Sequence, residues 1–149
     1  MAMLTHMRRT NRMPQQVHVL YSIRRTSPPA AEGTVSGSLD TLKDVLFATR
    51  LRDLATERVD SMVLDFYMTR GEPAGSGAAP DVRYWKDNVS ILDGKMRKGE
   101  IEEALGPVEE RGETVCYVCG PQKMTDEIVD MVGKVEGMDA ERVLCEKWW

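Results

Sequence analysis

The sequence predicts an α/β fold in which helices cover both faces of a mainly parallel sheet, the doubly wound arrangement. Two observations carry this prediction. Segments of strand length alternate along the chain with segments of helical periodicity. The first strand segment, VHVLYSI, is apolar at almost every position, which is typical of a strand covered on both faces. With 149 residues and no internal repeat, residues 1–149 are expected to form a single domain.

The first half of the chain predicts a helix, a strand, a second helix and a second strand. Met3, Leu4 and Met7 share one face of a short opening helix that ends before Pro14. β-Branched and aromatic residues predict a strand over residues 17–23. A segment rich in Ser, Pro and Gly then predicts a loop. The segment SMVLDFYMT predicts the second strand.

The helix between these two strands is predicted from a start signal and an apolar stripe. Thr41 and Asp44 resemble a capping box, although Glu or Gln is the usual second partner. The apolar residues of the following segment recur at helical spacing and predict one buried face; they are Leu42, Val45, Leu46, Leu51 and Leu54.

The second half of the chain predicts two further helices and two further strands. Residues 70–85, rich in Gly, Pro and Ala at their start, are expected to form a flexible insertion. GEIEEAL predicts a short helix that ends at Gly106 and Pro107. TVCYVC predicts a strand, PQKMTDEIVDMVGKV an amphipathic helix, and RVLCE a last strand before the terminal KWW.

The order of these elements lacks the usual beginning of the fold. Doubly wound dinucleotide-binding domains begin with a strand, a glycine-rich turn and a helix. This chain begins with the helix, has no GxGxxG motif, and has no glycine before Gly33. The fold is therefore either a variant or one that lacks its first strand.

Composition excludes several classes of protein. No apolar run approaches the roughly 20 residues that a membrane-spanning helix needs. Three cysteines are too few for a disulfide scaffold, so a reducing, intracellular compartment is expected. Five arginines and no acidic residue precede Glu32, a pattern compatible with a mitochondrial presequence or with a basic part of the folded domain. The acidic remainder, with few aromatic residues, argues against a nucleic-acid partner.

The segment CYVCGPQKMTD contains two cysteines that a metal site or a redox dithiol would also contain. On a strand, Cys116 and Cys119 point to opposite faces because they are three residues apart. No second cysteine pair or histidine pair completes a metal site, so no metal is expected. The alternative is that the motif is Cys-Gly-Pro at the carboxyl end of a parallel strand, beside a helix N-terminus, where α/β sheets bind cofactors. A buried cysteine at the end of the strand is an equally simple interpretation.

The segment YVCGPQKMTDEIV, followed by a last strand and a terminal aromatic residue, resembles the nicotinamide-binding domain of the ferredoxin–NADP reductase family. LYSIR, YVCGPQKMTDE and LCEKWW are more similar still to the oxidoreductase NAD-binding domain-containing proteins. The resemblance covers most of the chain and is weakest at the insertion. It implies a Rossmann-like sheet and a domain, truncated at its N-terminus, that lacks the first strand, the glycine-rich turn and a preceding flavin domain. It also argues against a presequence, because the basic stretch is already occupied by a helix and a strand.

The resemblance also implies roles for individual residues. Cys119 matches the family cysteine beside the nicotinamide, with a positional role at the point of hydride transfer. Gly120 and Pro121 would shape the cofactor crevice, and Met124 would pack under it or simply fill the helix core. An aromatic C-terminus in the family stacks on the flavin, and Trp149 stands at that position with Trp148 before it.

Residues that follow the first predicted strand are expected to contact the adenosine ribose. An acidic residue there suits a free 2′-hydroxyl, whereas an arginine suits a 2′-phosphate. Arg24 and Arg25 therefore favour NADPH, unless both are solvated loop residues. Ser22 is a candidate hydrogen-bond partner of the ribose.

The resemblance implies the NAD(P)H-binding part of a flavin-dependent oxidoreductase that transfers hydride between NAD(P)H and FAD. The electron acceptor is unknown, and the FAD would require the domain that this chain lacks. The chain alone is therefore expected to be inactive, and the alternative function is a truncated, non-catalytic remnant or fragment.

Overall fold

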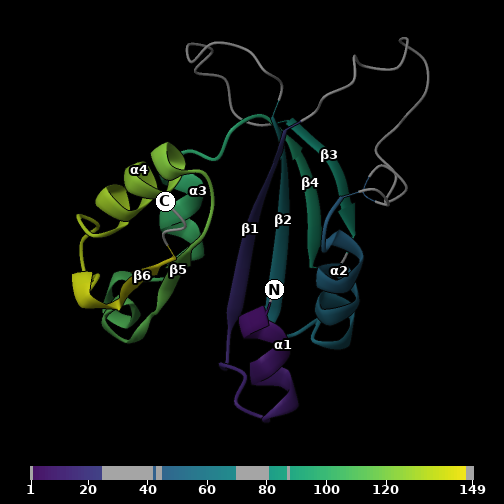
Figure 1. The fold of residues 1–149 in the computed structure, drawn as a ribbon, viewed down its shortest axis with the longest axis horizontal. Helices are drawn as coiled ribbons and strands as arrows, with labels where there is room; N and C mark the ends of the chain where they lie inside the picture. Colours follow the sequence, from purple (N-terminus) through teal and green to yellow (C-terminus); the bar gives the residue numbers. More distant parts are fainter. Residues whose placement is uncertain (1, 25–41, 43–44, 70–80, 87, 147–149) are drawn as a thin grey trace. The chain divides into compact units, whose positions relative to one another are not determined.

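The computed structural model describes residues 2–24, 42, 45–69, 81–86 and 88–146 (Figure 1). The chain divides into two compact units, Met1–Met96 and Arg97–Trp149, and each is described by itself. Whether both belong to one domain, as the sequence predicts, stays a prediction. Among the described residues, no helix has the length and apolar character that crossing a membrane requires.

The first unit is built on a four-stranded sheet in the order β1-β2-β4-β3. Figure 1 shows the four strands side by side, with β1 at one edge. Neighbouring strands run parallel from β1 to β2 and from β2 to β4, and β3 runs antiparallel to β4. The sheet consists of β1 (Val17–Arg24), β2 (Met62–Thr69), β3 (Asp81–Lys86) and β4 (Val89–Asp93). The predicted α/β class with a parallel sheet is confirmed at this level.

Two helices accompany this sheet. α1 (Ala2–Arg9) forms where the opening helix is predicted. α2 (Ala48–Glu57) begins later than the capping-box prediction, because Phe47 adopts a left-handed backbone with φ 65° that no continuous helix allows. Leu42 and Val45 still contribute to the core, but they lie before the helix. Thr41 and Asp44 lie outside the described residues.

The core of the first unit lies between α2 and one face of the sheet. Leu51 and Leu54 of α2 are 2% and 4% exposed, and Leu64 and Phe66 of β2 are both 0% exposed. Tyr21 of β1 packs edge-on against Phe66, with ring centroids 5.8 Å apart. The alternation of side chains along β2 therefore directs its even-numbered residues into this core.

The β3–β4 hairpin is a feature that the sequence analysis missed. Residues 81–85 fall in the predicted insertion, yet they belong to β3. Its pairing partner β4 comes from a segment for which no strand was predicted. Both strands are short and follow a Gly- and Pro-rich stretch, so their residues alone give only a weak strand signal. They are recognised as strands because they pair with each other. The rest of the predicted insertion, residues 70–80, lies outside the described residues.

The second unit is a smaller α/β arrangement. Its two-stranded parallel sheet pairs β5 (Cys116–Val118) with β6 (Val143–Cys145), and α4 (Gln122–Val132) packs against both strands. α3 (Lys98–Ala104) precedes them, as GEIEEAL predicts. Two short 3₁₀ helices, η2 (Val108–Glu113) and η3 (Ala140–Arg142), complete it.

Among the described residues, β1 and β5 are edge strands of their sheets. β1 is the last strand of the four-stranded sheet, and β5 pairs with β6 alone among the described residues. The general α/β class is thus observed, whereas the ferredoxin-reductase type stays a prediction.

Candidate functional site

The Cys-Gly-Pro segment forms the turn between β5 and α4. β5 ends at Val118 and α4 begins at Gln122, so Cys119, Gly120 and Pro121 make the whole connection. Pro121 takes the N-cap position with φ −56° and ψ 145°, and no side chain caps the helix there. The strand, turn and helix follow one another as the sequence predicts. This arrangement places the turn at the carboxyl end of a parallel strand, the edge at which α/β sheets bind ligands.

Thr125 holds this turn from inside the unit. Its side chain is fully buried, and its Oγ1 donates a hydrogen bond to the Gly120 carbonyl oxygen at 3.1 Å. Its backbone N–H donates to the Pro121 carbonyl oxygen at 2.9 Å. Thr125 is not among the residues predicted from the sequence to form the site. A threonine in the first helical turn after Gly-Pro is a usable signal, because its hydroxyl can reach back to the preceding turn.

Gly120 lies under the side chain of Met124. A Cβ added to Gly120 would collide with the terminal methyl group of Met124, and the Met124 sulfur and Thr125 Oγ1 would follow at 3.5 and 3.8 Å. The absence of a side chain at Gly120 therefore lets the flexible methionine cover the turn. Met124 is half-buried in this position. Its contact with Gly120 agrees with either predicted role, and contact with a cofactor stays a prediction.

Cys119 is exposed at the turn, whereas Cys116 is half-buried on the strand. The exposure of Cys119 excludes the alternative of a buried cysteine at the strand end. All three cysteines, including Cys145, are free thiols. Burial raises the pKa of the Cys116 thiol, which keeps it protonated and unreactive. Among the described residues, no group of three or more His, Cys, Asp or Glu side chains is placed to hold a metal ion.

Tyr117 and Glu146 form a pair beside Cys119. A hydrogen bond from the Tyr117 phenol to the Glu146 carboxylate, with smaller contributions from burial and from the nearby Glu146, Cys119 and Cys145 charges, raises the Tyr117 pKa to about 12. Tyr117 is directly opposite Leu144 in the β5–β6 register, so Glu146, two residues further on, continues the same face. The sequence analysis missed this pair, because only strand pairing brings the two residues together.

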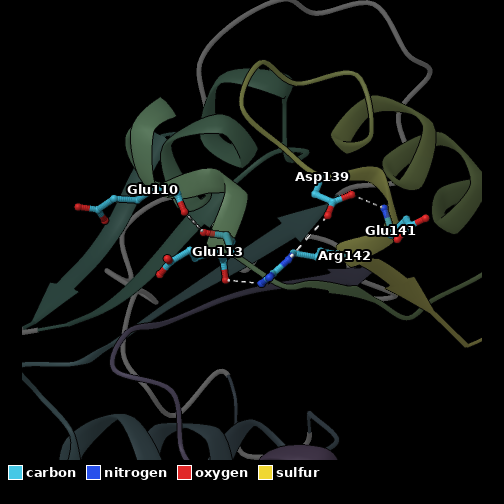
Figure 2. Close-up of polar contacts among 6 residues, drawn as sticks. Glu110, Glu113, Asp139, Glu141 and Arg142 are labelled. Atoms are coloured by element: carbon cyan, nitrogen blue, oxygen red, sulfur yellow. Dashed lines mark hydrogen bonds and ion pairs between the residues drawn. The ribbon is translucent and has the colours of Figure 1, made fainter.

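A set of polar contacts places β6 beside β5. Figure 2 shows Arg142 between Asp139 and the backbone of Glu113. Its guanidinium donates to the Glu113 carbonyl oxygen at 3.2 Å and lies 3.8 Å from an Asp139 carboxylate oxygen. The other Asp139 oxygen accepts a hydrogen bond from the Glu141 N–H at 2.9 Å. These contacts tie η3 to the end of η2, the two segments that lead into β6 and β5.

The remaining predicted cofactor-binding residues belong to the first unit or to undescribed parts of the chain. Ser22 and Arg24 lie at the carboxyl end of β1, and both are exposed. Arg25, Trp148 and Trp149 lie outside the described residues. The structure thus brings together Cys119, Gly120, Pro121 and Met124 at one turn, while Ser22 and Arg24 share a strand end in the other unit.

Comparison with curated proteins identifies one similar protein. Over 136 residues the chain is 26% identical to the zebrafish (Danio rerio) protein named Oxidoreductase NAD-binding domain-containing protein 1. The chain is a distant relative of this protein. The match covers 91% of the chain and 40% of the zebrafish protein, so the chain spans well under half of its relative's length.

The name of this relative describes a protein with an NAD-binding oxidoreductase domain. The more specific resemblance to the ferredoxin–NADP reductases stays a prediction. No protein-family model matches the chain. No solved structure matches it either.

Proposed function

We propose that this chain is the nicotinamide-dinucleotide-binding part of an oxidoreductase in which hydride passes between NAD(P)H and FAD. The observation that carries the proposal is the Cys119-Gly120-Pro121 turn, exposed at the carboxyl end of β5 and leading into α4. The name of the zebrafish relative adds the class of cofactor and the class of reaction. That relative is much longer than this chain, which leaves room for a flavin-binding part elsewhere in such a protein.

The geometry of the turn suits a positional role better than a nucleophilic one. Residues 97–149 contain no histidine that could activate a thiol. Cys119 directly follows the end of β5, where its side chain limits how closely a flat ring approaches. Thr125 fixes the backbone on which Cys119 is carried, through its bonds to Gly120 and Pro121. A fixed surface of this kind favours one orientation of a bound reactant.

Bound nicotinamide and flavin supply the redox chemistry, because two electrons and a proton move together as hydride from the reduced nicotinamide to the oxidised flavin. This chain would bind the dinucleotide, orient its nicotinamide ring and shield that ring from water. Cys119 and the backbone of Gly120 would line the nicotinamide position, and Met124 would pack against Gly120. Ser22, Arg24 and Arg25 would serve the adenosine end.

Dinucleotide binding tests the first part of the proposal. We expect NADH or NADPH to bind the chain in isothermal titration calorimetry, and Cys119→Leu to weaken that binding at least about tenfold, because the larger side chain fills the nicotinamide position. Cys116→Ser is the matched control, since it alters a half-buried thiol on the same strand and should leave the affinity unchanged. Equal affinity in Cys119→Leu and the unaltered chain would contradict the assignment.

Flavin turnover tests the second part. The chain of 149 residues with added FAD is expected to oxidise neither NADH nor NADPH faster than free flavin, with ferricyanide as the acceptor. Steady turnover above that background, with flavin retained through gel filtration, would show that these residues suffice. A longer protein that contains this chain and binds FAD is expected to turn over. Its failure to do so, with the dinucleotide bound, would favour the alternative of a non-catalytic binding remnant.

A further inference from the structure

The strands β1 and β2 end side by side at the carboxyl edge of the first sheet. β1 ends at Arg24 and β2 ends at Thr69, and the parallel register places these two residues directly opposite each other. Ligands of α/β proteins bind at this edge of the sheet. Thr69 is therefore the neighbour, on the next strand, of an arginine predicted to contact the adenosine end of the dinucleotide.

The Thr69 side chain bonds to the peptide group that carries Arg24. Its Oγ1 donates a hydrogen bond to the Ile23 carbonyl oxygen at 3.0 Å. That carbonyl and the Arg24 nitrogen belong to one planar peptide group, because the C–N bond between them has partial double-bond character. The bond from Thr69 therefore fixes the plane from which Arg24 begins.

Arg24 and Thr69 lie on the face of the sheet opposite the core of the first unit. Tyr21 and Phe66, which are directly opposite each other in the same register, pack together in that core. Side chains alternate between faces along a strand, so Arg24 and Thr69, each three residues further on, point to the other face. Ser22 points to this face as well, which gathers three polar side chains at the proposed adenosine end.

An arginine that binds a phosphate gains from a fixed backbone. The guanidinium binds phosphate through two parallel N–H···O bonds, which require a defined direction of approach. The side chain also loses rotamer freedom on binding, and any backbone freedom would be lost at the same moment. Among the described residues, Arg24 belongs to the last β1–β2 pair, so no further pair restrains it. The Thr69 hydroxyl supplies a restraint at that position.

We propose that Thr69 is a positioning residue for the 2′-phosphate of NADPH and that it acts through Arg24. The guanidinium of Arg24 would pair with the phosphate, while the Thr69 hydroxyl holds the peptide group from which that side chain extends. The inference rests on the proposed function, because it assigns a residue to the adenosine end of the same dinucleotide site. Thr69 lies in a segment predicted as a strand, but only the β1–β2 register brings it to Arg24.

Two nucleotides that differ only in the 2′-phosphate test the proposal on the chain of 149 residues. Isothermal titration calorimetry gives the dissociation constants of adenosine 2′,5′-bisphosphate and adenosine 5′-monophosphate, neither of which contains nicotinamide. The unaltered chain is expected to prefer the bisphosphate, and Arg24→Ala should reduce that preference. Thr69→Val should reduce it about two- to tenfold, which corresponds to the loss of one hydrogen bond. Thr69→Ser keeps the hydroxyl and should keep the preference.

Thr56→Val is the matched control for the loss of a threonine hydroxyl. The Thr56 hydroxyl bonds to the Arg52 carbonyl oxygen at 2.9 Å on α2, so its loss should leave the preference unchanged. The double variant Arg24→Ala/Thr69→Val should show the same preference as Arg24→Ala alone, since Thr69 acts through Arg24. An unchanged preference in Thr69→Val would overturn the proposal. An equal loss of affinity for both nucleotides would also overturn it, because a purely structural role of Thr69 predicts that result.

Failure of the proposed function gives a different result. If Cys119 does not face the nicotinamide, Cys119→Leu binds NADPH as tightly as the unaltered chain does, while the nucleotide preference and its dependence on Thr69 remain. If the unaltered chain shows no preference for the bisphosphate, the role of Thr69 is refuted, and binding of NADH at the Cys119-Gly120-Pro121 turn is unaffected by that result.

Discussion

The hydroxyl of Thr125 donates a hydrogen bond to the carbonyl oxygen of Gly120, and the 3.1 Å between Oγ1 and that oxygen joins the first turn of α4 to the end of β5. Because the Thr125 side chain is fully buried, water cannot replace the Gly120 carbonyl as the partner of its hydroxyl. The position of the exposed Cys119 therefore depends on a side chain six residues further along the sequence.

Thr125→Val is expected to lower the free energy of unfolding by about 1 kcal/mol, because the shape is kept while the hydrogen bond is lost. Urea unfolding followed by circular dichroism measures the change. Thr56→Val is the control, since the Thr56 hydroxyl bonds to the Arg52 carbonyl oxygen on the exposed face of α2 and its loss should change stability little. An equal decrease in the free energy of unfolding for both variants would contradict a special role for Thr125.

Gly137→Ala is expected to destabilise the protein by about 2 kcal/mol. Gly137 has φ +82°, and a Cβ there would press on the backbone carbonyl of Val108, which cannot move aside cheaply. Gly99→Ala is the matched substitution inside α3, where nothing lies within 4 Å of the added Cβ. It should stabilise by about 0.5–1 kcal/mol, because alanine is the better helix former. Thermal unfolding of both variants should shift the midpoint in opposite directions.

The Tyr117 phenol is expected to lose its proton at a higher pH than an ordinary tyrosine does. Its pKa is raised from 10.0 to about 12, first by the hydrogen bond to Glu146, so the neutral phenol is favoured in the folded state. The stabilisation is fully present below pH 10 and is lost as the pH rises from 10 toward 12. Absorbance of tyrosinate at alkaline pH should show this late step. Glu146→Gln should move it to lower pH, and an unchanged titration would refute the pair.

The three cysteines are expected to react as three free thiols in protein unfolded without reductant. Cys116 lies on β5 and Cys119 in the turn that follows it, and the two do not form a disulfide in the structure. Before unfolding, Cys119 should react first, because it is exposed and the other two are half-buried. A count of one free thiol would mean that two of them are bonded.

Replacement of Arg24 and Arg25 by alanine is expected to weaken NADPH binding more than NADH binding. If they contact the 2′-phosphate, each charge-assisted hydrogen bond is worth roughly 1.5–3 kcal/mol, or about ten- to a hundredfold in affinity. The dissociation constants of both dinucleotides should be measured on the same preparation. Replacement of Arg9, a cation of α1 far from the strand end in sequence, is the control. Equal losses for NADPH and NADH would remove the assignment.

The elements that depend on local pattern are predictable from the residues alone. The apolar runs of β1 and β2 and the periodicity of α1 and α4 indicate those elements, because the spacing of apolar side chains follows the local geometry of a strand or a helix. The Cys-Gly-Pro turn was also predictable, since Gly120 and Pro121 end a strand and begin a helix for reasons of backbone geometry.

Features that require pairing between distant residues depend on the folded chain and cannot be predicted from local pattern. β3 and β4 are strands because they pair with each other, and Phe47 delays α2 through a single left-handed residue that no periodicity reveals. The hydrogen bond of Tyr117 to Glu146 depends on the register of β5 and β6. The position of β1 at the margin of the four described strands likewise depends on strand order, because a strand's own residues look the same in the middle of a sheet and at its margin.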